Sequence, residues 1–516
     1  MFAYNYSRRV SRPVSVGKAV IGGNAPVLIQ SMTNTSTLDT EASAAQSRLI
    51  ADAGGELVRL TTQGVREAAN LACIKTELRK SGCDVPLSAD VHFNPKAAFE
   101  AARTADKVRI NPGNFVDAAR TFRKLEFSEE EYAAEIDRIR QSLVPFLDLC
   151  REHGTAVRLG VNHGSLSDRI MSRYGDTPAG MVESVMEYLR IAREVAFNDI
   201  VISIKASNTV VMVETVRLLA RVMKSENMDF PLHLGVTEAG DAEDGRIKSA
   251  VGIGTLLHEG LGDTIRVSLS EPPENEIPVA ILLRDHVMRR AEVPHIGVPE
   301  NVMPGKSRDY ADKSLSLREF SISDSRLIGS MAAEIDRFVA GGGRNPVLMT
   351  IHYACDSLDE LRVRAGADFG ALLMSGYGSE IRVEDPGFSR SELDRLALDI
   401  MQAARLRFYK TEFIACPSCG RTLFDLQSTL KEVKEAVTAL GIKGLKIGVM
   451  GCIVNGPGEM ADADYGYVGA GPGRVSIYRG KQLVTKNIPA SEALPALLDL
   501  IRSDRSTSAP EEGTPA

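Results

Sequence analysis

The run DIVISIKAS (199–207) indicates the fold class, because a β-branched apolar segment ends there in polar side chains. The same pattern, a short apolar run with a polar tip and then a helix-like segment, repeats along the chain. The runs are PVLIQSM (26–32), LVRLT (57–61), VPLSADVHF (85–93), KVRINPGN (107–114), AVRLGVN (156–162), DIVISIKAS (199–207), PLHLGVTEAG (231–240) and DTIRVSLS (263–270). Eight units over about 245 residues predict an α/β fold with a (β/α)8 TIM barrel. A doubly wound open sheet would need a glycine turn after the first run, and QSMTNT (30–35) is not one.

Polar side chains recur two residues apart at the ends of these runs, so the members of each set share one face of a strand. The sets are Asp90 with His92, Arg109 with Asn111, Arg158 with Asn162 through Gly160, Ser203 with Lys205 and Ser207, and Arg266 with Ser268. In a barrel the C-terminal strand ends form the active site, so we expect these groups to meet at one mouth.

The charge at this predicted mouth is positive. Five cations stand against two acids, a net charge of plus three, from Arg59, Arg109, Arg158, Lys205 and Arg266 against Asp90 and Glu238. Planar guanidinium groups suit a diphosphate, so we predict a small, highly charged anion as the ligand. A rim salt bridge is the alternative for any single arginine, but five cations on successive strand ends argue against it for the whole set.

The composition bounds the class of protein. The 516 residues are 44% hydrophobic and 25% charged, as in soluble globular proteins of two or three domains. A net charge of -7 argues against nucleic-acid binding through a broad basic face. No apolar run suits a membrane span, and the first residues lack the apolar core of a signal peptide. We therefore predict a cytoplasmic protein whose seven cysteines are reduced or bind metal.

The repeating pattern of apolar runs and helix-like segments ends after the eighth run. We predict a substrate-binding barrel over 1–284, an inserted α/β segment over 285–410, a small α/β domain with a cysteine motif over 411–503, and a disordered tail over 504–516. The insert has helix-like runs at 283–292 and 391–406 and strand-like runs at NPVLMTIHYA (345–354) and FGALLMSG (369–376). In the last domain we expect helices near 424–440 and 490–503 and strands at 444–451, 465–471, 474–480 and 482–488. The runs GAGPGR (469–474) and GIGTLL (252–257) complete no nucleotide-binding motif, so we interpret both as turns.

Three cysteines lie in motif-like settings, Cys416 and Cys419 in CPSC and Cys452 in GCIVNGPGE (451–459). Such a CxxC turn suits half of a zinc or an iron–sulfur site, which Cys452 could join. Zinc is common for an isolated CxxC, but no second CxxC or HxxxH closes a tetrahedral site here. The fourth ligand stays open, and Glu459 is a candidate because the preceding GPG could turn the chain back.

The other cysteines offer a weaker source of a fourth ligand. We expect Cys73, Cys83 and Cys150 to be buried structural residues in the helical layer of the barrel. A carboxylate is a harder and more easily displaced donor than a thiolate, so a glutamate ligand would leave one metal position open to a substrate oxygen.

The motifs QSMTNT, VRLT, ADVHF, VRINPGN, RLGVNHGSL, ISIKAS, GVTEAG, CPSCGR and GCIVNGPGE together resemble the 4-hydroxy-3-methylbut-2-en-1-yl diphosphate synthase family of the non-mevalonate isoprenoid pathway. The resemblance covers residues from about 8 to 285 and from 411 to 503. It implies reductive ring opening and dehydration of 2-C-methyl-D-erythritol 2,4-cyclodiphosphate to (E)-4-hydroxy-3-methylbut-2-enyl diphosphate. A 4Fe-4S cluster, an electron donor that is a ferredoxin or a flavodoxin, and a homodimer are implied as well.

The resemblance also implies a role for particular residues. It assigns the cluster ligands to Cys416, Cys419, Cys452 and Glu459. It assigns the diphosphate contacts to Arg59, Arg109, Arg158, Asn162 and Lys205, with Ser268 nearby, and catalytic roles to Glu238 and Asp90. The insert departs from the short members of the family, in which one subunit's cluster caps the other's barrel, and from long members with a further barrel-like domain. A zinc-stabilised, non-redox barrel that binds a phosphorylated metabolite is the competing hypothesis.

Overall fold

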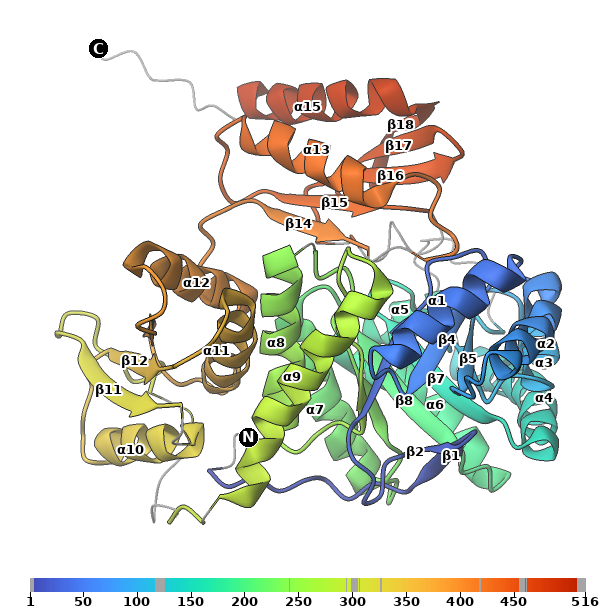
Figure 1. The fold of residues 1–516 in the computed structure, drawn as a ribbon, viewed down its shortest axis with the longest axis horizontal. Helices are drawn as coiled ribbons and strands as arrows, with labels where there is room; N and C mark the ends of the chain where they lie inside the picture. Colours follow the sequence, from blue (N-terminus) through green and yellow to red (C-terminus); the bar gives the residue numbers. More distant parts are fainter. Residues whose placement is uncertain are drawn as a thin grey trace.

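The structure is a computed structural model. It describes residues 4–507, except 117–125, 241, 294, 298–304, 306, 325–326, 417–418, 454–459 and 461. Eight parallel strands form a closed barrel in the order β10-β3-β4-β5-β6-β7-β8-β9, which confirms the predicted fold (Figure 1). The strands are β3 (Leu28–Met32), β4 (Leu57–Thr62), β5 (Leu87–Val91), β6 (Lys107–Ile110), β7 (Ala156–Asn162), β8 (Ile200–Lys205), β9 (Leu232–Leu234) and β10 (Thr264–Ile265).

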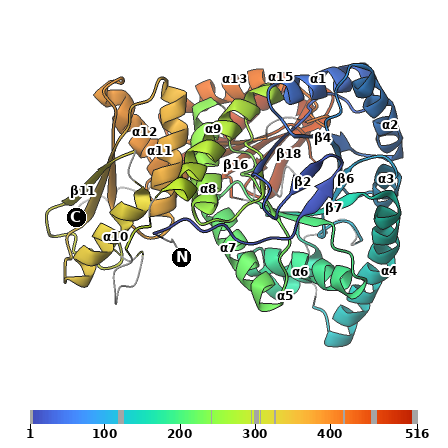
Figure 2. The ribbon, with the colours of Figure 1, turned by 60° about the horizontal axis from the view of Figure 1, so that its bottom comes forward.

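Helices surround the barrel and pack apolar side chains against it. They are α1 (Thr40–Asp52), α2 (Val65–Lys80), α3 (Pro95–Ala102), α4 (Glu129–His153), α5 (Asp168–Tyr174), α6 (Pro178–Glu194), α7 (Thr209–Ser225), α8 (Ala242–His258) and α9 (Glu276–Met288). A hairpin of β1 (Val14–Val16) and β2 (Ala19–Ile21) covers the N-terminal end of the strands (Figure 2). That end is therefore closed, and the opposite end is left for the polar strand tips.

The strand register brings the polar tips into contact. Arg109 of β6 lies in register with Asp90 of β5 on one side and with Arg158 of β7 on the other. Asn162 of β7 is likewise opposite Lys205 of β8. Because alternate residues of a strand point to one face, these side chains all enter the barrel.

The middle segment is a three-stranded parallel sheet with helices beside it. It consists of β11 (Arg318–Ser323), α10 (Ile328–Ala340), β12 (Val347–His352), α11 (Leu358–Leu373), β13 (Glu380–Glu384) and α12 (Arg390–Ala403). The strand predicted at 345–354 and the helix predicted at 391–406 are confirmed. The strand predicted at FGALLMSG (369–376) is wrong, because these residues form the end of α11 and the turn after it. Burial on all sides makes a helix apolar all round, and such a run cannot be told from a strand by its pattern.

The prediction that GIGTLL (252–257) forms a turn is also wrong. These residues are part of α8, which packs against α11. A Cβ at Gly254 would lie 2.7 Å from the Cβ of Ala367, and one at Gly370 would lie 2.8 Å from the Cα of Val251. The glycines therefore serve close helix packing, which holds the middle segment against the barrel (Figure 1).

The C-terminal domain is a five-stranded sheet in the order β14-β15-β16-β17-β18, with two helices on it. Its elements are β14 (Glu412–Ala415), α13 (Leu426–Thr438), β15 (Lys446–Met450), β16 (Tyr465–Gly471), β17 (Arg474–Arg479), β18 (Gln482–Pro489) and α15 (Ala490–Thr507). The predicted strands and helices are confirmed, as is the turn within GAGPGR. Helix α15 extends to Thr507, past the predicted start of the tail, and 508–516 lie outside the described residues.

This domain lies over the mouth of the barrel of its own chain (Figure 1). Lys248 of α8 forms an ion pair with Glu412 at 2.8 Å, and Lys410 pairs with Asp244 at 2.7 Å. Ala239, after β9, forms a β-bridge with Ala415. In the described part of the chain, the helices are all too short or too polar to cross a membrane.

Candidate active site

Asp90 is the centre of the cationic group in the barrel mouth. Its Oδ1 lies 3.4 Å from Arg109 Nη1 and 3.4 Å from Arg158 Nη2, and all three side chains are buried. Burial opposes ionisation of Asp90, but Arg59, Arg109 and His92 hold the pKa of its carboxyl well below the usual range. Asp90 is therefore an anion that orders the surrounding arginines.

Lys205 and Arg59 differ from the two arginines that pair with Asp90. Among the residues described, neither side chain forms an ion pair with a carboxylate, although both are buried. Burial and the neighbouring Arg59 and Arg158 lower the pKa of Lys205 well below its ordinary value. Burial also lowers the pKa of Arg59 to about 10, only partly offset by Asp90. A dianionic ligand would relieve this concentration of positive charge.

His92 is the neutral member of the group. Burial lowers its pKa to about 3, and the cations Arg109 and Arg421 act in the same direction. Its Nδ1 lies 3.0 Å from Arg109 Nη1. The imidazole is thus uncharged at neutral pH and helps to position Arg109.

Arg266, counted among the mouth cations from sequence, is neutralised. Its Nε and Nη2 each donate a hydrogen bond of 2.9 Å to the Glu276 carboxylate, which also accepts one from Ser31 Oγ at 2.6 Å. Glu276 begins α9 and follows no recognisable motif, so sequence reasoning missed it.

Arg421 replaces that charge, and sequence reasoning missed it as well. It follows the CPSCG motif, extends from the C-terminal domain into the mouth and lies 3.8 Å from Asp90 Oδ2. Burial works against its charge, but Cys419, Asp90 and Cys452 together raise its pKa. The net charge of plus three is retained, because Arg59, Arg109, Arg158, Lys205 and Arg421 outweigh Asp90 and Glu238 by five to two.

Glu238 lies on the loop between β9 and the bridge at Ala239, beside the cysteine motif. Its side chain is 3% exposed, and its backbone has φ +50°, a conformation that costs a residue with a side chain roughly 1–3 kcal/mol. Such strain persists where the surrounding structure holds the residue in place. Asn162 and Ser268 are also buried at this end, and Asn162 Oδ1 accepts a hydrogen bond from Arg109 at 3.3 Å.

The three motif cysteines follow the adjacent parallel strands β14 and β15, and two of them, Cys419 and Cys452, act on the charge of Arg421. Cys416 Sγ accepts a hydrogen bond of 3.3 Å from the N–H of Gly451, the residue before Cys452. Cys419 lies near enough to Arg421 to raise the pKa of the guanidinium. Glu459, the fourth predicted ligand, lies outside the described residues.

The spacing of these thiols helps to distinguish a zinc site from an iron–sulfur site. Among the described residues, the only three ligand atoms of His, Cys, Asp or Glu found within 4.8 Å of one another belong to His258, His286 and Asp368. Zinc bonds of about 2.3 Å would hold three thiolates roughly 3.8 Å from one another, whereas the three motif sulfurs do not all lie within 4.8 Å of one another. A larger group that spreads its ligands, such as an iron–sulfur cluster, fits this donor set better.

The histidine group between α8, α9 and α11 is a hydrogen-bond network. His286 Nε2 and His258 Nε2 lie 2.9 and 3.2 Å from Asp368 Oδ1. Arginine N–H groups approach both Nδ1 atoms, Arg289 at 2.6 Å and Arg290 at 3.1 Å. Histidines that bind a metal donate their second N–H to an acceptor, which these arginines prevent. The group therefore binds the middle segment to the barrel rather than a cation.

The remaining cysteines differ in burial. Cys150 is buried as expected, and burial raises the pKa of its thiol to about 12. Cys83 is only partly buried, and the expectation of burial is wrong for Cys73, which is exposed on the outer face of α2.

The sequence matches two known family models. Residues 11–281 match the GcpE TIM-barrel domain, and residues 412–503 match the GcpE protein C-terminal domain. The 4-hydroxy-3-methylbut-2-en-1-yl diphosphate synthase (flavodoxin) of Bacteroides fragilis strain ATCC 25285 is 49% identical, with 98% of this chain and 97% of that protein covered. The proteins of the same name from Bacteroides thetaiotaomicron (49% identical; 98% and 99% covered) and Porphyromonas gingivalis (43% identical; 97% and 98% covered) are similar along their whole length. Such coverage includes the middle segment, which neither family model matches.

Proposed function

The chain belongs to the GcpE family, and on this premise we propose how its residues carry out the family's reaction. It is a 4-hydroxy-3-methylbut-2-en-1-yl diphosphate synthase, an oxidoreductase of isoprenoid biosynthesis. Its substrate is 2-C-methyl-D-erythritol 2,4-cyclodiphosphate, and its product is (E)-4-hydroxy-3-methylbut-2-enyl diphosphate. The reaction consumes two electrons, opens the ring at a C–O bond and releases water.

Diphosphate binding is assigned to the mouth cations. Arg59 and Lys205, which have no carboxylate partner in the described structure, would contact the phosphoryl oxygens first. Arg109 and Arg158, already ordered by Asp90, would present their remaining N–H groups to the same anion. Asn162 and Ser268 would complete the site. Burial of all these groups supports the proposal, because a desolvated cation attracts a phosphate strongly.

The protein is an iron–sulfur enzyme that takes electrons from a flavodoxin. We assign to it a 4Fe-4S cluster held by Cys416, Cys419, Cys452 and Glu459, and a cytoplasmic location. The cluster, when bound, supplies the electrons one at a time. The cysteine positions support this assignment, because Cys419 and Cys452 act on the charge of Arg421, which extends to Asp90 of the anion site.

Proton transfer is assigned to Glu238. Asp90 is held as an anion by arginines, so it is a poor acid and instead positions Arg109 and Arg158 near the reacting carbons. Glu238, buried on the loop that bridges to the cysteine motif, would protonate the departing hydroxyl oxygen. The covering C-terminal domain would exclude water while this occurs.

One observation carries this proposal. Arg421 lies 3.8 Å from the barrel carboxylate Asp90, and Cys419 and Cys452 raise its pKa, so one side chain of the cysteine domain links the two sites. Protein purified without oxygen should be brown, contain about four irons and convert the cyclic diphosphate when reduced flavodoxin is supplied. A colourless protein with one zinc and no turnover would instead support the non-redox alternative.

Replacing Arg421 with methionine should preserve the iron content but lower turnover at least tenfold. The buried cation beside the thiols favours the reduced cluster, so its loss should make the midpoint potential more negative. Redox titration and turnover check this, with the exposed Arg474→Met as the matched control and Arg421→Lys as a partial rescue. Unchanged potential and turnover in R421M would remove Arg421 from the mechanism.

The assembly state follows as a further part of the proposal. We expect a homodimer in which each barrel is covered by the C-terminal domain of its own chain, as the Lys248–Glu412 and Lys410–Asp244 pairs support. Light scattering measures the mass. Mixing E238Q with a variant defective in the cysteines tests the sharing of sites, and recovery of activity would show that sites form between chains.

A further inference from the structure

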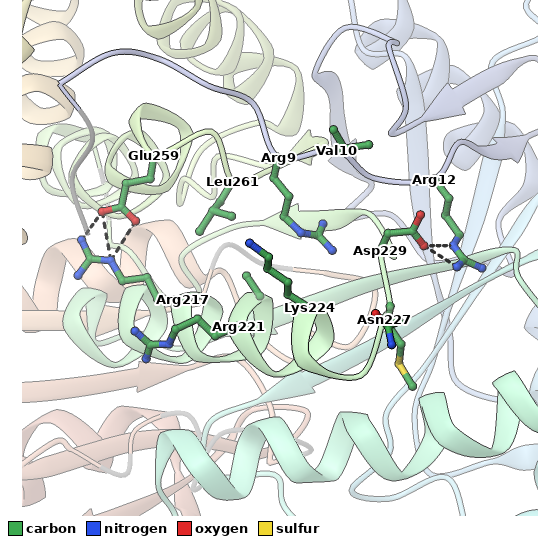
Figure 3. Close-up of a pocket in the computed structure, with 12 residues that line it drawn as sticks. Arg9, Val10, Arg12, Arg217, Arg221, Lys224, Asn227, Asp229, Glu259 and Leu261 are labelled. Carbon is green, nitrogen blue, oxygen red and sulfur yellow. Dashed lines mark hydrogen bonds and ion pairs between the residues drawn. The ribbon is translucent and has the colours of Figure 1, made fainter. Parts of the chain in front are cut away.

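A second cationic hollow lies at the closed end of the barrel. It has a volume of about 830 Å³ and is bounded by α7, the N-terminal segment around Arg9, and the loops at Asp229 and Leu261 (Figure 3). These loops lead from helices α7 and α8 into strands β9 and β10. They therefore lie at the N-terminal ends of the strands, opposite the mouth that holds Asp90 and the cysteines.

Helix periodicity places the charges of this hollow on one face. Arg217, Arg221 and Lys224 follow one another at intervals of four and three residues along α7. Arg9, on the N-terminal segment, lines the same hollow (Figure 3). Arg221 and Lys224 are exposed to solvent, and a bound anion would reduce the repulsion among the cations of the hollow.

Two of the cations are neutralised within the chain. Arg217 pairs with Glu259 and, at 2.6 Å, with Glu214, and Arg12 pairs with Asp229 at 2.5 Å. These pairs use both acids that line the hollow.

Three cations remain available. Arg9 donates one hydrogen bond of 3.0 Å to the carbonyl of Phe230, and neither Arg221 nor Lys224 has a carboxylate partner in the described part of the chain. Burial lowers the pKa of Arg9, which shows that part of its charge is already out of water. Asp263 and Asp229 partly offset this effect, and the lining residues together carry a net charge of plus three.

Most of the uncharged residues that line the hollow are apolar. Val10 is 84% exposed beside Arg9, Ala220, Met228 and Leu261 also line the hollow, and Asn227 is the polar exception. An exposed valine between cations would gain from contact with a hydrocarbon. The hollow thus offers charge for a phosphate and a surface for a short chain.

We propose that this hollow is a second binding site for a small diphosphate ester with a short apolar chain. Arg9, Arg221 and Lys224 hold the diphosphate, and Val10, Ala220 and Leu261 contact the chain. The site is independent of the mouth, because the two open on opposite ends of the barrel and share no residue.

Calorimetric titration of the holoenzyme with inorganic diphosphate and with pentyl diphosphate tests this proposal. We expect two sites in the wild type. In R221E/K224E one site should weaken at least tenfold while the mouth site and the basal turnover stay unchanged. Pentyl diphosphate should bind the hollow more tightly than inorganic diphosphate, and Val10→Ser should reduce that preference.

The control is R66E/R79E, which makes the same change of charge at two exposed arginines of α2 outside the hollow. It should keep both sites. Thermal unfolding shows whether each variant is folded. A wild type with one site that R221E/K224E leaves unaltered, or equal loss in R66E/R79E, overturns the proposal. Loss of the mouth site alone, for example in R158Q, bears on the diphosphate binding of the reaction and not on the hollow.

Discussion

Glu238→Gln should lower kcat by roughly 10²–10⁴-fold and leave substrate affinity nearly unchanged. Glutamine fills the same buried volume beside the bridge to Ala415 but cannot deliver a proton to the departing oxygen. The cations that hold the diphosphate are untouched, so binding should persist. Anaerobic single-turnover assays measure the chemical step, and calorimetry with the cyclic diphosphate measures affinity.

The matched control for this change is Glu271→Gln. Glu271 follows β10 at the same end of the barrel and pairs with Arg246 at its rim. We expect nearly full turnover from it. If E238Q also keeps its turnover, the proton comes from another group, and the assignment of Glu238 is wrong.

Glu459→Cys should keep the iron of the protein and lose its activity. A fourth thiolate binds iron more firmly than a carboxylate and would not be displaced by a substrate oxygen. Cys452→Ser should instead lose most of the iron together with the activity, because a motif thiolate is removed. Iron analysis and visible absorbance of protein purified without oxygen separate the two variants.

The comparison of these two variants tests the different roles assigned to Glu459 and Cys452. An active E459C would show that a displaceable ligand at this position is unnecessary. Full iron content in C452S would show that Cys452 is not a ligand of the cluster. Mössbauer spectra of both variants, compared with the wild type, report whether one iron differs from the others.

Much of the fold could be predicted because its signals are local. Eight apolar runs with polar tips predicted the barrel, and the strand register of Asp90, Arg109 and Arg158 agrees with the shared face inferred from alternation. Local patterns failed where packing decides. GIGTLL and FGALLMSG lie in α8 and α11, whose glycines and small residues serve contact between two buried helices.

The candidate active site, like the fold, could be predicted from the sequence only in part. Sequence alone determined which side chains of the strands enter the mouth, because the alternation of a strand is a property of the backbone. Only the tertiary structure decided which of those charges remain available. Arg266 is neutralised by Glu276 from the next helix, and Arg421 reaches Asp90 from a separate domain. Ion pairs depend on distances between elements that are remote in sequence, and those distances exist only once the elements have packed together.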